Sequence, residues 1–524
     1  MKIVLDDIEL LPGREGEGDV REAVERACGG RISGDIRLLR KSLDARKKGH
    51  ILYRCRVAVE LPDEEARNML GRPGVSLYRE TEAPPVIRAR GGIRVAVVGT
   101  GPAGLFCALR LAEAGAEVEL FERGRPVEER HDDVARLKNE GRLDPESNVL
   151  FGEGGAGTYS DGKLTARTHR PEADWFFRKM VEMGAPEEIL YEAKPHVGTD
   201  RLITILKNIR QSLLSAGSAL HFRERVTDIL REGDRAAGLV AASGRECRAH
   251  AVVLASGHSA RDVYAMLRRQ GIALEAKGFA VGARIEHPAE LISFIQYGKA
   301  ALALPLPAAE YRLAWNDPRT GRGVYSFCMC PGGEVINASS EEEGLCVNGM
   351  SYSGRDLPRS NAALVVTVRP GDFGSDPLQG IAFQRDLERA AYRAGGGGFV
   401  APAESVPGFL GNRGGGGFPE TSYRPGVRAS RLSEYLPAWI VEELRQALRR
   451  FDRQMRGFAG PEALLIGAET RTSSPVRVVR GGDLQSVSLR GLYPAGEGAG
   501  YAGGIVSSAV DGIRTADQII GNYQ

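Results

Sequence analysis

The clearest pattern along the chain is an apolar run over residues 93–98, followed by a glycine-rich turn and by leucines at helical spacing over residues 102–114. A short apolar run of this kind predicts a buried strand, and the leucines predict a helix that packs on it. A second apolar run over residues 117–122 predicts another strand, which ends in an acidic residue. A strand, a turn, a helix and a strand in this order predict an α/β unit of the Rossmann type.

The turn of this unit has the glycine spacing G-x-G-x-x-G, and it comprises Gly99, Gly101, Pro102, Ala103 and Gly104. These glycines permit a tight turn, a close approach of backbone to a pyrophosphate, and close packing of helix on strand, while the helix N-terminus offers N–H groups to phosphates. Glu122 at the end of the second strand is placed to accept hydrogen bonds from ribose hydroxyls. The same spacing recurs at residues 152–157 and 498–503, but only the first occurrence has this context. We therefore predict a dinucleotide site here.

The remaining patterns divide the chain into four segments. Residues 1–82 run strand–helix–strand–strand–helix–strand, the order of a ferredoxin-like module. Residues 93–275 form the first part of the dinucleotide-binding domain. Residues 276–464 carry short strand-like runs separated by turns, which predicts an inserted, mainly antiparallel β-rich substrate domain. Residues 465–524 return to a strand, glycines and a helix, and complete the discontinuous Rossmann-like domain of this α/β protein.

Composition adds few constraints. The 524 residues are 42% hydrophobic and 26% charged, and the net charge is +2, which favours neither a nucleic-acid partner nor an acidic one. No signal-like N-terminus and no apolar run near the length of a membrane span occurs, so we expect a cytoplasmic protein without a membrane partner. The seven cysteines are scattered without a C-x-x-C pair, which disfavours a disulfide framework and a thioredoxin-type redox pair.

The C-terminal segment indicates which dinucleotide binds. A strand there ends in Gly496 and Glu497, and a helix begins at Gly504 and Ile505. A flavin uses such a unit, because the acid meets ribityl or pyrophosphate oxygens and the positive helix end faces the ring edge where charge develops on reduction. Lys163, in the glycine-rich segment 151–164, would face a phosphate or the ring. The predicted cofactor is FAD.

Several motifs together carry a resemblance to a known family: GTGPAGLFCALRLAEAG, LFGEGGAGTYSDGKL, VVLASGHSARD, SFCMCPGG, NGMSYSGR, ETRTSSPVR and YPAGEGAGYAGGIVSSAVDGI. From residue 93 onward the chain resembles the uncharacterised bacterial FAD-dependent dehydrogenases (NAD(P)/FAD-dependent oxidoreductases), which share the glutathione-reductase and p-hydroxybenzoate-hydroxylase type of FAD fold. The resemblance implies pyrophosphate at residues 99–104 and adenosine ribose at Glu122 with Arg123 beside it. It also implies adenine near Val226 and the backbone of Ser256 and Gly257, and ribityl and flavin at Gly496, Glu497, Gly504 and Ile505.

Candidates for the chemistry lie on the substrate side. Cys330 is a candidate reactive thiol, Tyr352 a proton donor, Arg355 an anion clamp, and Arg471 a bidentate carboxylate or phosphate ligand. Each has a structural alternative: a buried apolar cysteine, a surface turn, or an internal salt bridge. No metal site is predicted. Because there is no second G-x-G-x-x-G unit between a strand and a helix, NAD(P)H would dock transiently at the flavin rather than in its own domain.

These patterns favour an FAD-dependent oxidoreductase that dehydrogenates or reduces a small organic substrate. One alternative is a flavin-dependent monooxygenase or halogenase. Another is an RNA-associated flavoprotein using the basic residues between 37 and 56, although Asp35 and Asp44 interrupt that basic run and favour a solvated hairpin. A flavin-dependent sensory or structural protein without turnover is a third. The substrate, the electron donor and the oligomeric state stay open.

Overall fold

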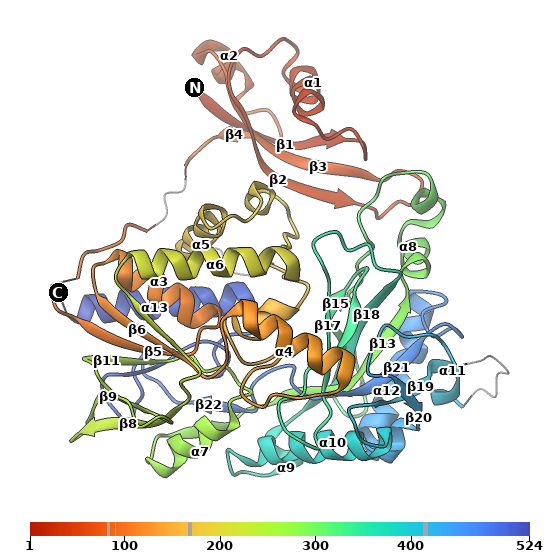
Figure 1. The fold of residues 1–524 in the computed structure, drawn as a ribbon. Coiled ribbons are helices and arrows are strands. Elements are labelled where there is room, and N and C mark those ends of the chain that lie inside the picture. Colours follow the sequence, from red (N-terminus) through yellow and green to blue (C-terminus); the bar gives the residue numbers. More distant parts are fainter. Residues whose placement is uncertain (81–83, 90, 166–169, 412–417, 524) are drawn as a thin grey trace.

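The computed structural model describes residues 1–524 except 81–83, 90, 166–169, 412–417 and 524 (Figure 1). The predicted boundary between residues 82 and 93 therefore lies partly outside the described residues. Among those that are described, no helix has both the length and the apolar character needed to cross a bilayer.

The N-terminal segment forms a four-stranded antiparallel sheet with strand order β2-β3-β1-β4. Its elements are β1 (Lys2–Leu10), α1 (Glu17–Cys28), β2 (Ile36–Asp44), β3 (Leu52–Glu60), α2 (Asp63–Met69) and β4 (Val75–Leu77). Alternate residues of β3, including Val57 and Val59, point to one face, where Val24 of α1 and Ala66 of α2 cover them. The order of elements is the β-α-β-β-α-β order read from the sequence.

The G-x-G-x-x-G unit lies in a five-stranded parallel sheet with strand order β23-β11-β5-β6-β7. The strands are β5 (Arg94–Val98), β6 (Glu117–Glu122), β7 (Ala219–Phe222), β11 (Ala251–Leu254) and β23 (Leu492–Pro494). The edge strand β23 comes from the C-terminal segment, so residues almost 400 positions apart complete one Rossmann-like sheet.

The two faces of this sheet are covered differently (Figure 1). Val95 and Val97 face four helices: α3 (Pro102–Glu113), α5 (Pro171–Glu182), α6 (Thr199–Ser215) and α13 (Ile505–Asn522). Ala96 and Val98 face the opposite layer, which contains α7 (Arg261–Arg269) and an antiparallel sheet of β8 (Val226–Glu232), β9 (Arg235–Ala241) and β10 (Glu246–Arg248). Both faces are buried, which explains why β5 is a continuous apolar run rather than an alternating one.

A seven-stranded sheet has the order β14-β15-β18-β13-β21-β19-β20, and every neighbouring pair is antiparallel except β19 and β20. Its strands are β13 (Phe279–Pro288), β14 (Ala314–Asn316), β15 (Gly323–Cys330), β18 (Arg359–Val368), β19 (Ala401–Ser405), β20 (Val427–Ala429) and β21 (Leu464–Glu469). Because β21 belongs to this sheet, the sheet extends to Glu469, beyond the predicted segment boundary at residue 464.

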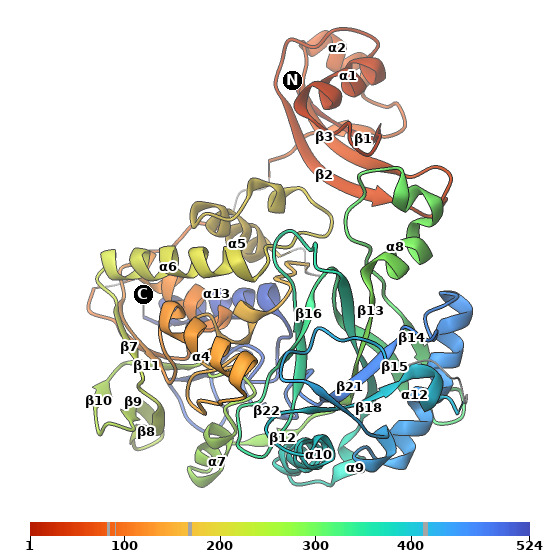
Figure 2. The same ribbon diagram turned by 45° about the vertical axis from the view of Figure 1, so that its right-hand side comes forward.

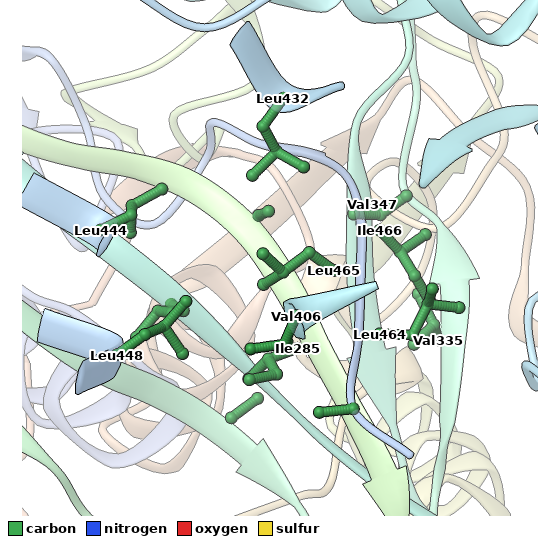
Figure 3. Packing of buried hydrophobic residues seen from close by; sticks show 14 of the residues in the cluster. Ile285, Val335, Val347, Val406, Leu432, Leu444, Leu448, Leu464, Leu465 and Ile466 are labelled. Carbon is green, nitrogen blue, oxygen red and sulfur yellow. The ribbon is translucent and has the colours of Figure 1, made fainter. Parts of the chain in front are cut away.

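The core of this sheet is apolar and closely packed. Leu444 and Leu448 of α12 (Ala438–Gln454) lie against Leu465 and Ile285 (Figure 3). The surrounding elements are α8 (Ala289–Tyr297), η3 (Gly298–Leu302), β16 (Glu334–Asn337), β17 (Val347–Met350), α9 (Pro370–Phe373), α10 (Gln379–Gly395), α11 (Val406–Phe409) and η4 (Leu432–Glu434).

The chain passes between the parallel and the seven-stranded sheets at two adjacent strands. These strands, β12 (Leu274–Ala276) and β22 (Val476–Val478), pair antiparallel with one another. The N-terminal sheet lies across the top of both units (Figures 1 and 2). The Lys41 backbone pairs with Tyr191 and Ala193 on one side, and the Lys48 ammonium donates to the Ile295 carbonyl on the other.

Candidate functional site

The G-x-G-x-x-G turn joins β5 to α3 so closely that only glycine fits at positions 99 and 104. Gly99 has a φ of 97°, and a Cβ there would lie 2.5 Å from the Ala255 carbonyl oxygen. A Cβ on Gly104 would lie 1.9 Å from the Gly99 carbonyl oxygen. Helix α3 begins at Pro102 after Gly101, which supplies no side-chain cap, and its first turn has no acidic residue. Its first N–H groups are therefore available for an anion, as a pyrophosphate site requires.

A second glycine-rich segment, residues 152–157, lies directly on this turn, and we call it the glycine loop. The Gly154 N–H donates to the Thr100 carbonyl over 2.9 Å, and a Cβ on Gly155 would lie 3.0 Å from the Gly101 Cα. A Cβ on Gly157 would lie 3.1 Å from the Ile505 side chain, in the first turn of α13. The N-termini of α3 and α13 therefore meet at the glycine loop.

The N-terminus of α13 is as open as that of α3. Gly504, its N-cap, has a φ of 95°, and no described heavy atom lies within 4 Å of a Cβ placed there, apart from its own chain neighbours. The first turn has no acidic residue, and the Gly504 N–H donates to the Glu497 carboxyl from the preceding turn. Gly496 is fixed upstream, because its N–H donates to the Asp511 carboxylate over 2.8 Å. This end of the helix can approach an electron-rich group without a steric barrier.

Glu122 holds three turns together. Its carboxylate accepts hydrogen bonds from Thr100 N, Thr100 Oγ1, Gly124 N and Gly152 N, at 2.8–3.0 Å. A carboxylate has about four acceptor positions, so a ribose hydroxyl would reach Glu122 only by displacing one of these donors. The neighbouring Arg123 donates to Asp262 over 2.7 Å and lies over the Phe151 ring.

Arg130 fixes the glycine loop by hydrogen bonds, and no motif in the sequence identifies it. Its guanidinium is fully buried and donates to the carbonyls of Asn148, Val149, Gly152, Glu153 and Gly155 and to Thr158 Oγ1. It lies on α4 (Val127–Glu140), on the same face as Val127, Val134 and Leu137. A charged residue on the apolar face of a predicted helix is the signal that could have identified it.

Glu497 lies near a half-buried histidine, His258. Glu497 Oε1 is 3.7 Å from His258 Nε2. Burial raises the pKa of the Glu497 carboxyl to about 7, and burial beside Arg471 and Arg261 lowers the pKa of His258 to about 3. Both shifts favour the uncharged form, so this is a pair of polar groups rather than an ion pair.

The backbone predicted to face the adenosine lies close by. A Cβ on Gly498 would lie 2.7 Å from Gly257, and Ser256 Cα lies 3.1 Å from a Cβ placed on Gly99. Val226 is buried at the start of β8.

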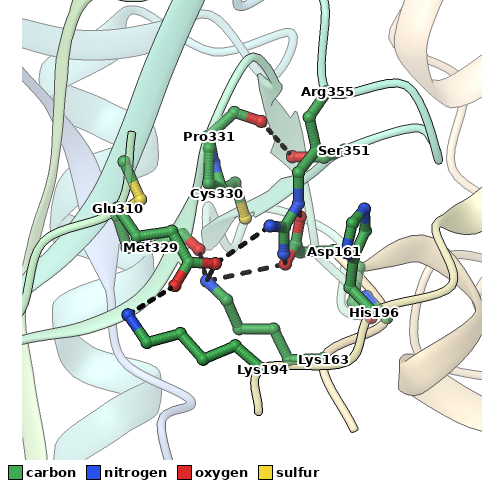
Figure 4. A network of polar contacts seen from close by, with 12 residues as sticks. Asp161, Lys163, Lys194, His196, Glu310, Met329, Cys330, Pro331, Ser351 and Arg355 are labelled. Atoms are coloured by element: carbon green, nitrogen blue, oxygen red, sulfur yellow. Dashed lines mark hydrogen bonds and ion pairs between the residues drawn. The ribbon is translucent and has the colours of Figure 1, made fainter. Parts of the chain in front are cut away.

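A polar cluster gathers where the parallel-sheet unit meets the seven-stranded sheet, and it consists of Asp161, Lys163, Lys194, Glu310 and Arg355 (Figure 4). Arg355 donates to Asp161 and Glu310 over 2.9 Å each, and Lys194 lies 3.3 Å from Glu310. Burial alone would raise the pKa of Glu310, but Lys163, Arg355 and Lys194 hold it below its usual range. Lys163 also donates to the Met329 carbonyl, so the segment that follows the glycine loop is tied to β15.

The predicted catalytic residues are not all brought together. Tyr352, 36% exposed, lies three residues before Arg355 at the polar cluster. Cys330 is buried, its Sγ lies 3.3 Å from Arg284 Nη2, and burial raises the pKa of its thiol. The thiol is therefore held neutral beside the buried Arg284–Glu469 ion pair.

Arg471 lies in a different environment from the polar cluster. It is buried and bonds Glu388 in a bidentate pair at 2.9 Å, and Arg261 bonds the same carboxylate. This arrangement is the internal salt bridge considered from the sequence as an alternative. Glu388 occupies the Nε and Nη2 edge of the guanidinium that a carboxylate or phosphate ligand would need.

Sequence comparisons identify relatives of this chain. Residues 278–472 match the family "FAD-dependent protein, C-terminal domain-like", and residues 97–127 match "NAD(P)-binding Rossmann-like domain". An uncharacterised protein of Clostridium beijerinckii is 44% identical over 494 residues, which are 93% of this chain and 92% of that protein.

Solved structures show only remote similarity. The FAD complex of CtdE is 12% identical with a TM-score of 0.33, over 82% of this chain and 84% of that one. The flavin-dependent brominase Bmp2 is 14% identical with a TM-score of 0.37, over 82% and 79%. At these TM-scores, nothing about the chemistry of this chain follows from them.

Proposed function

This chain belongs to a family of FAD-dependent proteins, and from that premise we propose that it is an oxidoreductase that dehydrogenates or reduces a small organic substrate. FAD is its cofactor. When bound, FAD accepts or donates a hydride. The observation that carries the proposal is the meeting of two uncapped helix N-termini, those of α3 and α13, at the glycine loop.

The residues present fit this cofactor. The first turn of α3, which follows Gly99 and Gly101 and contains Gly104, would hold the pyrophosphate. Glu122 and Arg123 would lie on the ribose side, with Val226, Ser256 and Gly257 toward the adenine. Gly504 and Ile505 would direct the positive end of α13 toward the ring, where reduction places negative charge.

Glu497 would act as a proton donor or acceptor near the N-terminus of α13. With a pKa of about 7, it is partly protonated at neutral pH and can donate a hydrogen bond as well as accept one. His258 beside it stays neutral throughout the physiological range. A pyridine nucleotide would dock transiently on the same face as the substrate.

On the substrate side, the polar cluster is suited to an anionic group. Its three cations outnumber its two carboxylates. The Lys194 side chain is 71% exposed and that of Lys163 is 30% exposed, whereas that of Asp161 is only 5% exposed. The cations are therefore the groups that an incoming substrate meets first, with Arg355 behind them and Tyr352 beside them as a proton donor.

An anaerobic titration of the purified flavoprotein tests the proposal. We expect NADH or NADPH to bleach the flavin absorption. A substrate that the reduced enzyme reduces should restore the absorption, and a substrate that the oxidised enzyme dehydrogenates should bleach it. Failure of both nucleotides, with full reduction by dithionite, would contradict a pyridine-nucleotide-linked oxidoreductase. Substrate-dependent consumption of O₂ by the reduced enzyme would favour the monooxygenase or halogenase instead.

A further inference from the structure

Four large apolar side chains are exposed at one corner of the molecule. Leu302 is 86% exposed, Leu11 56%, Phe294 54% and Leu304 37%. Leu11 follows β1, whereas the other three belong to the segment of α8, η3 and the loop after it. We call these four residues the apolar corner. Single exposed apolar residues are ordinary on protein surfaces, but several together mark an interaction site.

The two segments that form the apolar corner are in direct contact. Lys48 Nζ donates to the Ile295 carbonyl over 2.7 Å, and a Cβ on Gly298 would lie 3.4 Å from Lys48 Cδ. A Cβ on Gly13, two residues after Leu11, would lie 3.0 Å from the Pro305 ring. Figure 2 shows the turn between β2 and β3 beside the segment that contains α8.

Basic side chains surround the apolar corner. The turn between β2 and β3 carries Arg46, Lys47 and Lys48, η3 carries Lys299, and all four are exposed. Asp44 is occupied by Arg46 and Arg54. Of the acidic residues in the sequence around Leu11, Glu9 lies 3.2 Å from Arg54 and Glu15 lies 3.4 Å from Lys41. Glu17 at the start of α1 and Glu290 in the first turn of α8 are exposed. The four exposed basic side chains outnumber these last two carboxylates.

We propose that this corner docks the protein peripherally on the surface of a membrane that contains anionic lipids. Leucine and phenylalanine side chains flanked by lysines are the pattern of an interfacial anchor. Protein–protein interfaces differ, because they are depleted of lysine and rely on tyrosine, tryptophan and arginine.

The sequence alone predicts no membrane partner, because no apolar run marks a membrane segment. The corner is assembled from residues almost 300 positions apart, so only the fold shows it. Docking would be independent of the flavin site, since none of the residues described there contributes to the corner.

Flotation with lipid vesicles tests this proposal on the full-length flavoprotein. We expect binding to vesicles of equimolar phosphatidylglycerol and phosphatidylcholine, little binding to pure phosphatidylcholine, and release by high salt. Leu302→Ser with Phe294→Ser should lower the partition coefficient at least tenfold. The double variant Lys47→Glu with Lys299→Glu should lower the partition coefficient by more than the serine pair does, since each lysine near an anionic surface contributes about fivefold.

Leu214→Ser is the matched control, because Leu214 is 47% exposed on α6, away from the corner. It should bind as the unmodified protein does, and all variants should keep their flavin content and melting temperature. Two results would overturn the proposal: no binding to either vesicle, or binding that the corner variants leave unchanged. A self-association abolished by Leu302→Ser would assign the corner to a second copy and overturn it as well.

Discussion

The position of Arg130 leads to a quantitative prediction about cofactor binding. Its five N–H donors reach six acceptors in the glycine loop, in Asn148 and Val149 before it, and in Thr158 after it. In Arg130→Lys, the charge is kept, but an ammonium has three donors, so at least two of the five are lost. At about 1 kcal/mol of net stability for each donor, the ordered loop becomes less favourable by about 2 kcal/mol.

If FAD requires the ordered loop, it must supply that free energy when it binds, which corresponds to a roughly 30-fold higher Kd. The assay is titration of the apoprotein with FAD, followed by quenching of flavin fluorescence. Arg136→Lys is the matched control, because Arg136 lies on the same helix with its side chain 44% exposed. An Arg130→Lys protein that binds FAD within threefold of the unmodified protein, with an unchanged unfolding midpoint, would refute the reasoning.

Three further variants probe the site. Gly101 has a backbone φ of −72°, which any residue adopts, so Gly101→Glu should fold. It should be colourless, because its carboxylate would occupy the phosphate position, whereas Gly91→Glu at an exposed position should stay yellow. Normal flavin content in Gly101→Glu would contradict the assignment. For Glu497, a pKa raised from 4.5 to about 7 means that its contribution to stability is present below pH 4.5 and lost as pH rises to 7. Apo Glu497→Gln should therefore match the unmodified apoprotein near pH 4 and gain up to about 3 kcal/mol over it by pH 8 in urea unfolding; a constant difference would contradict the shift. Arg471→Met should lower the free energy of unfolding by about 3 kcal/mol but leave the flavin-loaded enzyme reducible by its donor, and loss of reduction at normal stability would instead place Arg471 in catalysis.

The Rossmann-like unit could be predicted because its determinants are local. The apolar run, the glycines and the acid at Glu122 follow one another within thirty residues, and each has a separate steric or electrostatic reason. The C-terminal strand β23 was assigned to the same domain because its acid and glycines repeat that chemistry. The boundary at residue 464 was less accurate, since β21 is apolar throughout and nothing in its sequence separates it from a strand of either sheet.

The polar cluster and the apolar corner could not be predicted, because several distant segments form each of them. Lys163, Lys194, Glu310 and Arg355 come from four parts of the chain, and no local pattern brings them together. The role of Glu122 shows a second limit. Its position at the strand end predicts a ribose ligand, but its four protein donors depend on how the surrounding turns fold over it.

The central claim is that the N-termini of α3 and α13 hold one FAD molecule between them and the glycine loop. A crystal structure of the FAD-loaded protein tests this most directly. We predict the pyrophosphate within hydrogen-bond distance of the backbone N–H groups of Gly101, Ala103 and Gly104, and the pyrimidine edge of the flavin at Gly504 and Ile505. A pyrophosphate elsewhere, or a flavin ring whose pyrimidine edge does not approach the start of α13, would contradict the account.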